Sequence, residues 1–334
     1  MARRRRRSPP VEMTVTIESL TNDGRGVAHH EGKAVFVEDG LPGEVVRCQT
    51  TKRTSKYAMA KGLEVLEASN DRVQPRCSVA GICGGCSLQH MSDSGQIHAK
   101  QQVLLDNLQQ IGKVQPESVL TPLQGPHWHY RRKARLGVKL VPKKGGVLVG
   151  FREKQSGYLA VMESCEVLDE RFSSLVLPLR ELIAGISVAK RIPQIEVAAG
   201  DDAAVLVFRH LEPLSETDKD LLRGFGQQHN LSILLQPGGP DSIQALYPEK
   251  QELLEYRLDE WDVSIRFRPT DFTQVNASIN QLMISRALEL LEAEADDEVL
   301  DLFCGIGNFT LPLARVCKHV TGIEGDSVMV TMAR

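Results

Sequence analysis

The sequence around residue 300 constrains the fold of this chain more than any other part. Residues 298–303, EVLDLF, have the apolar character of a buried strand, and CGIGN at 304–308 supplies a tight turn. A helical pattern follows over 309–320, and a second strand over 320–326 contains an acidic residue at its end. This order predicts the first strand–helix–strand unit of a doubly wound sheet, which binds nucleotides at its first turn.

The glycine spacing in this turn separates two classes of nucleotide-binding domain. The dinucleotide fingerprint requires a third glycine at position 310, where this chain has Thr310. Asp301 at the strand end, Gly305, Gly307 and an acid 19 residues after Gly305 instead resemble motif one of the S-adenosylmethionine-dependent methyltransferases. In that arrangement the acid, Glu324, is placed to bond ribose hydroxyls.

The length of the chain predicts several domains. A single core rarely serves more than about 250 residues, and this chain has 334. Its contents of 42% hydrophobic and 25% charged residues are typical of globular proteins. No apolar run approaches the roughly 18 residues of a membrane span, and no signal peptide follows the first arginines. We therefore expect a cytoplasmic protein without a membrane partner.

The N-terminal part predicts a tail followed by a small barrel. Residues 1–11 hold five consecutive arginines, which favour a basic disordered tail or an arm that binds nucleic acid. Short strands separated by Gly and Pro turns over 12–68 predict a small closed barrel of the oligonucleotide-binding (OB) type, with any other small antiparallel barrel as the alternative. Its sequence, from LTNDGRG to KRTSKYAMA, resembles the RNA-binding TRAM domain. The resemblance suggests that Lys52, Arg53 and Lys56 contact phosphates, although a solvated loop would have the same residues.

Cysteine spacing predicts a metal or cluster site. Cys77, Cys83 and Cys86 form a Cys-x5-Cys-x2-Cys pattern in a glycine-rich segment that can turn backbone N–H groups toward sulfur, and Cys165 follows some 80 residues later. Structural zinc and ordinary buried cysteines are alternatives. The set resembles that of the iron–sulfur RNA uracil methyltransferases, which implies a [4Fe-4S] cluster on all four. Cys48 and Cys317 are expected in the core.

The central part, 69–267, predicts a mixed α+β domain with segregated charge. Residues 127–154 hold nine Lys or Arg and one acid, a local balance of +8, whereas the whole chain carries −3. Alternation over 129–140 followed by a KKGG turn predicts a hairpin with one cationic face. Candidates for RNA contacts from this segment are Arg131, Arg132 and Lys133.

Other elements follow from apolar spacing. A helix ending at Gly112, a single helix over 167–185 and a hairpin over 193–210 are expected. A core-facing helix over 279–293 is predicted to bury one stripe, formed by Ile279, Leu282, Met283, Ala287, Leu290 and Leu291.

The segment PTDFTQVN at 269–276 resembles the stretch of RNA uracil methyltransferases that lies between the cofactor and the target base. The resemblance implies cofactor contacts by Gln274, Phe303, Asn308 and Glu324, and a place for Phe272 near the target nucleotide. Burial as ordinary core aromatics is the alternative for Phe272 and Phe303.

The barrel, the four cysteines, FTQVN and DLFCGIGNFTLPLA occur in one order that resembles the bacterial uracil-5-methyltransferases of 23S ribosomal RNA. The resemblance implies that a cysteine thiolate adds to carbon 6 of a flipped-out uracil, carbon 5 takes the methyl group, and a base removes the carbon 5 proton. It places this cysteine and the basic glutamate in later strands, beyond Arg334, so no catalytic residue is expected within the chain. Cys304, in the cofactor turn, is therefore not the expected nucleophile.

The predicted fold is α/β and multidomain: an OB-like TRAM barrel, a central mixed α+β iron–sulfur domain, and the start of a Rossmann-like methyltransferase domain at 268–334. We expect a C-terminally truncated enzyme that exposes a parallel sheet edge and is inactive. The expected partner is 23S ribosomal RNA, with no protein partner inferred. A non-enzymatic RNA-binding iron–sulfur protein is the alternative, and a redox protein has little support because no partner-cofactor motif is present.

Overall fold

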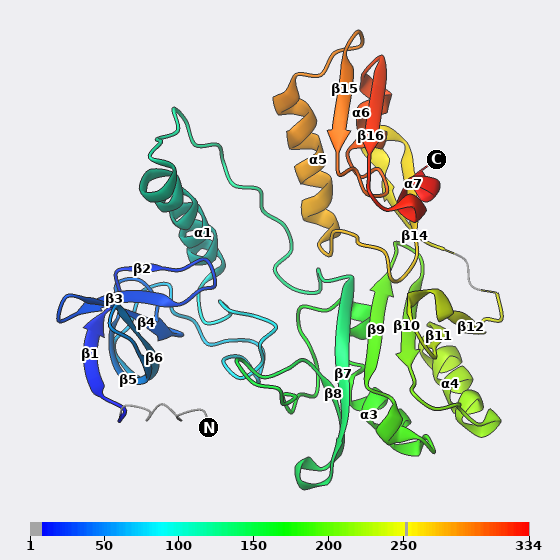
Figure 1. Ribbon diagram of the computed structural model, residues 1–334, viewed down its shortest axis with the longest axis horizontal. Helices are drawn as coiled ribbons and strands as arrows, with labels where there is room; N and C mark the ends of the chain where they lie inside the picture. Colours follow the sequence, from blue (N-terminus) through cyan, green and yellow to red (C-terminus); the bar gives the residue numbers. More distant parts are fainter. Residues whose placement is uncertain (1–8, 251–252, 334) are drawn as a thin grey trace, which may run out of the picture. The chain divides into compact units, whose positions relative to one another are not determined.

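The computed structural model describes residues 9–250 and 253–333, which form two compact units (Figure 1). The first unit extends to Pro122 and the second begins at Leu123. Most of the predicted basic tail, including all five arginines, lies outside the described residues, and so does Arg334. Within the described ranges, no helix combines the length and the apolar character needed to cross a membrane. The finer domain boundaries at residues 68 and 267 stay predictions.

The first unit contains a six-stranded sheet with the order β1-β5-β6-β4-β3-β2. Its strands lie within the predicted range of 12–68, and Cys48 is fully buried in their core, as expected. Strand β6 pairs antiparallel with β5 and parallel with β4, so it joins the two halves of the sheet. The strands are β1 Glu12–Thr16, β2 Ser19–Leu20, β3 Gly26–His30, β4 Lys33–Glu38, β5 Val45–Arg53 and β6 Tyr57–Glu67.

A buried carboxylate, Glu44, fastens this sheet to the segment that leads to the cysteines. Glu44 is fully buried and pairs with the guanidinium of Arg72, and it accepts backbone N–H groups from Leu41 at 2.9 Å and Ser69 at 3.3 Å. Burial alone would raise the pKa of Glu44, but these hydrogen bonds bring it below its ordinary value. The start of the cysteine segment is therefore fixed to the barrel.

The helix predicted to end at Gly112 is present, but two of its large apolar residues are exposed. Helix α1 spans Asp93–Asn107 and continues as a π-helical turn over Leu108–Gly112. Leu104 is 57% exposed and Ile111 is 79% exposed. The helix contributes Ala99 and Val103 to a small core formed with Leu20, Leu41 and Met91.

The second unit is built on a six-stranded sheet with the order β12-β11-β10-β9-β7-β8. Both predicted hairpins, β7–β8 and β9–β10, are present, and β10 pairs parallel with β11. Buried Ala134, Leu136 and Val138 alternate along β7 as predicted. The strands are β7 Lys133–Val141, β8 Gly146–Gly150, β9 Gln194–Ala199, β10 Ala204–Arg209, β11 Ser232–Gln236 and β12 Gln244–Tyr247.

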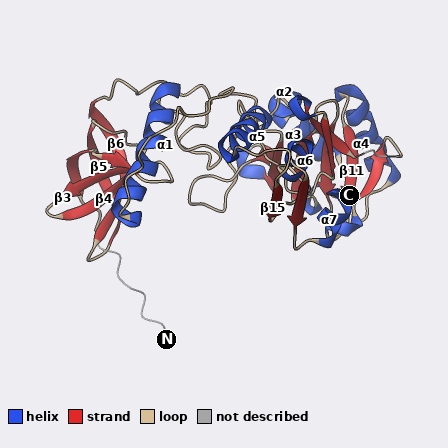
Figure 2. Cartoon of the chain, turned by 90° about the horizontal axis from the view of Figure 1, so that it is seen from above, coloured by secondary structure: helices blue, strands red, loops and turns tan. Residues whose placement is uncertain are grey.

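The single helix predicted over 167–185 is wrong, because two helices form there. Helix α2 spans Glu170–Ser173 and α3 spans Val176–Gly185, and α3 packs against β8. Pro178 lacks the N–H that a continuous helix would need at that position, so it fits only in the first turn of a new helix. Helix α4, Glu216–His229, packs against β11 and β12 (Figure 2).

The C-terminal part confirms the predicted strand–helix–strand unit. A hairpin of β13 and β14 leads to α5, and β15 and β16 then pair in parallel with α6 between them in the chain. One hydrophobic core joins these elements to the central sheet, including Val205, Leu254, Ile284 and Leu313. The bounds are β13 Leu254–Leu258, β14 Val263–Phe267, α5 Ala277–Leu291, β15 Glu298–Leu302, α6 Thr310–Val316, β16 His319–Ile323 and α7 Ser327–Ala333.

Two burial predictions fail in this part. Three residues of the stripe that was predicted to be buried on α5 are exposed: Leu282, Leu290 and Leu291. The helix meets the core through Ile284 and Leu288 instead. The strand at 298–303 was expected to be buried, but Leu300 and Leu302 of β15 are each 56% exposed. Within the described residues β15 and β16 pair only with each other, and the parallel edge expected from a truncation stays a prediction.

Candidate cofactor and RNA site

The turn between β15 and α6 needs its glycines for conformational and spatial reasons. Gly305 and Gly307 have φ angles of +59° and +92°, a region that disfavours other residues. A Cβ atom at Gly307 would also lie 2.9 Å from Cγ of Leu311. Phe303 adopts a φ of +62° without being glycine, which is unusual for a bulky residue and characteristic of functional turns.

Carboxylates occupy the ends of both parallel strands. Glu324 accepts the backbone N–H groups of Asp326 and Gly305, both at 3.0 Å, and these bonds hold its pKa below the ordinary value. The hydroxyl of Thr310 donates to Asp301 at 2.5 Å. Glu324 is thus an ionised hydrogen-bond acceptor beside the glycine turn, where ribose hydroxyls bind in this class of fold.

Two aromatic side chains of the candidate site are exposed. Phe303 is 90% exposed and Phe272 is 72% exposed. The alternative that they are ordinary core aromatics is therefore wrong for both. Each leaves a ring face open to a planar ligand group, such as a nucleobase or adenine.

Asn308, the third predicted cofactor contact, is bonded within the protein. Its Oδ1 accepts from the hydroxyl of Tyr256 and from Nδ2 of Asn280, and its Nδ2 donates to Oδ1 of Asn280, all at 2.9 Å. Burial raises the pKa of Tyr256, so its phenol stays protonated. Tyr256 and Asn280 were missed by sequence reasoning, because nothing in the local pattern marks a polar side chain that bonds across 28 or 52 residues.

The fourth predicted contact, Gln274, lies on a loop that is clamped to the start of β7. The backbone N–H of Arg132 donates to the carbonyl of Val275 at 2.9 Å, and Nζ of Lys133 donates to the carbonyl of Asp271. Burial lowers the pKa of Lys133. Gln274 is exposed and lines a pocket together with Arg132 and Asn280.

The three cations of the central segment that were predicted to contact RNA are thus bonded to other groups of the protein. The guanidinium of Arg131 donates to the carbonyl of Lys133 at 3.1 Å and lies over the ring of Phe151, and Arg132 pairs with Asp201. The RNA contacts of Arg131, Arg132 and Lys133 stay predictions, limited to the donors that these bonds leave available.

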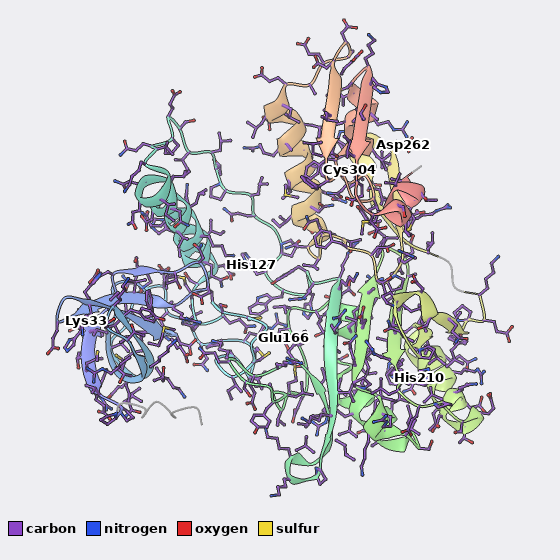
Figure 3. The ribbon with its side chains drawn as sticks, viewed as in Figure 1. Lys33, His127, Glu166, His210, Asp262 and Cys304 are labelled. Atoms are coloured by element: carbon purple, nitrogen blue, oxygen red, sulfur yellow. The ribbon has the colours of Figure 1, made fainter. Side chains whose placement is uncertain are left out.

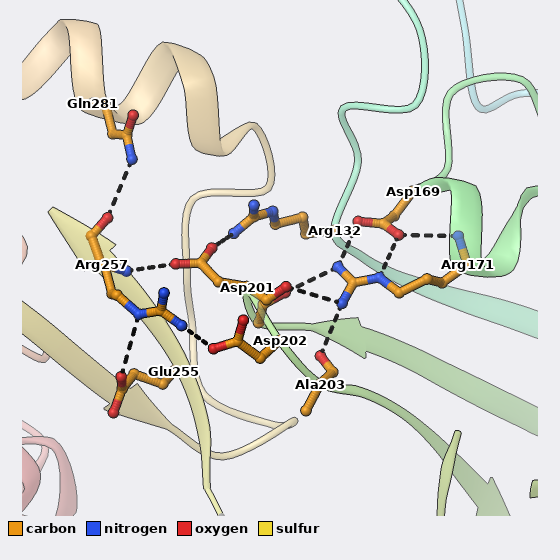
Figure 4. Close-up of polar contacts among 10 residues, drawn as sticks. Arg132, Asp169, Arg171, Asp201, Asp202, Ala203, Glu255, Arg257 and Gln281 are labelled. Carbon is orange, nitrogen blue, oxygen red and sulfur yellow. Dashed lines mark hydrogen bonds and ion pairs between the residues drawn. The ribbon is translucent and has the colours of Figure 1, made fainter. Parts of the chain in front are cut away.

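Asp201 is a further residue that sequence reasoning missed (Figure 4). Its Oδ1 binds the guanidinium of Arg132 at 2.5 Å, and its Oδ2 accepts the backbone N–H of Arg257 at 2.8 Å. Gly200, beside it, lies so close to β13 that a Cβ atom would overlap the carbonyl oxygen of Glu255. The β9–β10 turn therefore packs directly on β13. In the sequence, the glycine followed by two aspartates is the pattern that could have indicated this turn.

Cys304 lies at the carboxyl end of β15, in the cofactor turn (Figure 3). A Cβ atom at Gly322 would lie 2.9 Å from its sulfur, so the thiol packs closely on β16. Burial raises the pKa of the Cys304 thiol, and the carboxylates of Asp301 and Glu324 add to this. A raised pKa makes a thiol less reactive, and the expectation that Cys304 does not attack the substrate stays a prediction.

The catalytic cysteine and the basic glutamate were expected beyond Arg334, and the structure does not test this expectation. The described residues end at Ala333, and Arg334 itself lies outside them. The location of both catalytic groups after Arg334 therefore stays a prediction, as do the truncation and the inactivity that it implies.

The cysteine segment has part of the predicted character. Cys83 is buried, and the backbone N–H of Gly85 donates to its sulfur at 3.4 Å, as expected for a glycine-rich thiolate loop. Cys77, Cys83 and Cys86 belong to the first unit, whereas buried Cys165 belongs to the second. Across residues 9–250 and 253–333, no three His, Cys, Asp or Glu side chains are arranged as a metal site. The thiol donors suit an iron–sulfur cluster, and the [4Fe-4S] cluster on the four cysteines stays a prediction.

The barrel cations Lys52 and Arg53 lie at the end of β5 and are exposed. Nζ of Lys52 is 5.9 Å from the ring centre of Tyr57. The position is compatible with phosphate contacts, which stay a prediction.

The fold and the glycine turn define a methyltransferase of the Rossmann-like class attached to a TRAM barrel. The TRAM domain model matches residues 11–63, and the model for tRNA (uracil-5-)-methyltransferase matches residues 94–334. Because the second match covers most of the chain, the chain belongs to the uracil-5-methyltransferase family.

Relatives and a solved structure agree with this assignment. The 23S rRNA (uracil(1939)-C(5))-methyltransferase RlmD of Nitrosospira multiformis is 50% identical over 96% of this chain and 73% of its own length. The enzyme of the same name from Xanthomonas axonopodis pv. citri is 49% identical over 100% of this chain and 76% of its length. The tRNA (uracil-54, C5)-methyltransferase of Pyrococcus abyssi, solved with S-adenosyl-L-homocysteine, covers 96% of this chain and 75% of its own, with a TM-score of 0.69 and 20% identity, and so supports the fold.

Proposed function

We propose that this protein is a methyltransferase whose reaction moves a methyl group from S-adenosylmethionine to carbon 5 of uracil 1939 in 23S ribosomal RNA, in the cytoplasm. The observation that carries the proposal is the 50% identity to an enzyme named for this reaction, over 96% of the chain. The glycine turn, with the ionised carboxylate of Glu324 bonded to Gly305, supports a nucleoside cofactor at that place.

The residues around the turn have distinct proposed roles. S-adenosylmethionine, when bound, supplies an activated methyl group. Glu324 accepts the ribose hydroxyls, the exposed ring of Phe303 stacks on the adenine, and Asn308 and Gln274 donate hydrogen bonds to cofactor acceptors. Phe272, exposed on the loop that also carries Gln274, packs against the flipped-out uracil.

Uracil needs a nucleophile at carbon 6, because carbon 5 alone is a weak attacking atom. We propose that this nucleophile is a cysteine other than Cys304, because Cys304 belongs to the cofactor turn and its thiol packs on Gly322. Cys304→Ser should therefore leave cofactor binding intact, because sulfur and hydroxyl occupy similar space beside Gly322.

The test is cofactor and RNA binding by the purified chain, followed by methyl transfer from labelled S-adenosylmethionine to a 23S RNA fragment that contains uracil 1939. Micromolar binding of S-adenosylhomocysteine that weakens about tenfold or more in Gln274→Ala and Glu324→Ala would support the proposal. RNA binding together with indifference to the cofactor would contradict it and favour the RNA-binding alternative.

The methyl-transfer step also tests where the catalytic groups lie. If the cysteine and the glutamate follow Arg334, the 334-residue chain binds the cofactor without transferring its methyl group. Methyl transfer by this chain would show that both groups lie at or before Arg334 and would overturn the expectation of inactivity.

We also propose that Cys77, Cys83, Cys86 and Cys165 hold a [4Fe-4S] cluster. Four soft thiolates suit iron and sulfide, and the N–H of Gly85 donating to the Cys83 sulfur is a bond that stabilises such a thiolate. Protein purified without oxygen should contain about four irons and four sulfides per chain, and these should be lost in Cys83→Ser but retained in Cys317→Ser. Zinc in place of iron, or no metal, would contradict this assignment.

A further inference from the structure

The carboxamide of Asn308 is bonded on two sides before any cofactor binds. Its oxygen accepts from Tyr256 and Asn280, and its nitrogen donates one hydrogen to Asn280. An amide nitrogen carries two hydrogens, so within the described residues one N–H of Asn308 has no protein partner. The position of this remaining donor is set by the three bonds.

The two partners of Asn308 lie on elements outside the strand–helix–strand unit. Asn280 is on α5 and is 4% exposed, and Tyr256 is on β13 with its ring centre 5.8 Å from that of Phe267. Ile284, one turn beyond Asn280, is fully buried in the shared core. The Asn308 side chain is therefore attached to two elements whose own positions are fixed by packing.

The hydroxyl of Tyr256 determines which way the carboxamide faces. Among residues 9–250 and 253–333, the Tyr256 hydroxyl makes a single hydrogen bond, which is the one to Asn308. A half-buried hydroxyl without a partner is still costly, so this hydrogen is donated to the Asn308 oxygen and holds that oxygen toward β13. The amide nitrogen then carries the donor that remains available.

We propose that Tyr256 and Asn280 are positioning residues that hold the Asn308 carboxamide so that its remaining N–H meets the cofactor. The inference rests on the proposed function, because the acceptor is an oxygen or nitrogen of S-adenosylmethionine. A side chain that is already oriented loses less conformational freedom on binding, which strengthens the complex.

The test is calorimetric binding of S-adenosylhomocysteine to four proteins: the unaltered chain, Tyr256→Phe, Asn308→Ala and the double variant. Tyr256→Phe keeps the ring and removes one hydrogen bond, so affinity should fall about five- to tenfold. In the Asn308→Ala background the same change should have no further effect, because Tyr256 acts through Asn308. Tyr158→Phe, in a residue that is 67% exposed, is the matched control and should bind normally.

The outcomes separate the two ideas. An unaltered chain that does not bind S-adenosylhomocysteine removes the proposed function, and this inference with it. An unaltered chain that binds, while Tyr256→Phe binds equally well or loses the same factor in both backgrounds, overturns the inference alone. Should Tyr256→Phe fail to fold, Asn280→Asp, which keeps the oxygen and removes the donor to Asn308, decides the question in the same two backgrounds.

Discussion

At the scale of single residues, Asp201 should matter more for stability than its neighbour Asp202. Asp201→Ala leaves both the guanidinium of Arg132 and the N–H of Arg257 without this acceptor. We expect a loss of about 2 kcal/mol in the free energy of unfolding, measured in urea. Asp202→Ala is the control: its side chain is 78% exposed and pairs with Arg257, so the loss should stay below about 1 kcal/mol. Equal losses would contradict the special role of Asp201.

Residue-scale prediction from sequence worked where one type of residue is required by the backbone. Gly305 and Gly307 were identified correctly because only glycine fits their φ angles without strain. Asn280 could not be identified in this way, since its role depends on a hydrogen bond to Asn308, which lies 28 residues away. Long-range pairs of this kind have no local signature.

At the scale of elements, the start of α4 should contribute a pH-dependent part of the stability. Burial alone would raise the pKa of Asp218, but hydrogen bonds from Ser187 and Ser215 lower it from 3.8 to about 2. A carboxylate with a lowered pKa stabilises the fold above its unfolded value, and this stabilisation is lost as the pH falls from about 4 toward 2. Asp218→Asn should therefore lower the free energy of unfolding by about 2 kcal/mol near neutral pH.

The measurement for Asp218 is urea unfolding of both proteins between about pH 6 and pH 3. The difference between them should be constant above about pH 4 and should shrink below it. Asp220→Asn is the matched control on the same helix, because Asp220 is 71% exposed and pairs only with Arg223 among the described residues. A difference that does not change with pH would rule out Asp218 as the titrating group.

The elements themselves were predicted better than their faces. Hairpins and the strand–helix–strand unit follow from local alternation and turn residues, and these were found. The buried face of α5 was not found, because the helix has leucines on several sides and the two of its apolar residues that are buried in the shared core are Ile284 and Leu288. Which side is covered depends on what packs there, and apolar spacing alone does not contain this information.

At the scale of the whole molecule, the sequence predicted a barrel, a central domain and a methyltransferase domain. The two compact units divide after Pro122, so the cysteine segment and α1 group with the barrel, and the finer boundaries at residues 68 and 267 stay predictions. Glu44, buried beneath the segment that starts at Ser69, shows the physical reason: the polar junction is fastened to the barrel by Arg72. A junction made by a buried ion pair does not show in composition.

The whole chain carries a net charge of −3, so any affinity for RNA must come from local patches. We expect the logarithm of RNA affinity to fall linearly with the logarithm of salt concentration. The slope should decrease by about 1.4 in the double variant Lys52→Ala, Arg53→Ala, since each of the two phosphate contacts contributes roughly 0.7. Fluorescence anisotropy with a labelled single-stranded RNA measures both slopes. Lys219→Ala, at a site paired with Glu216, is the control and should leave the slope unchanged. An unchanged slope in the double variant would show that this end of β5 does not contact phosphates.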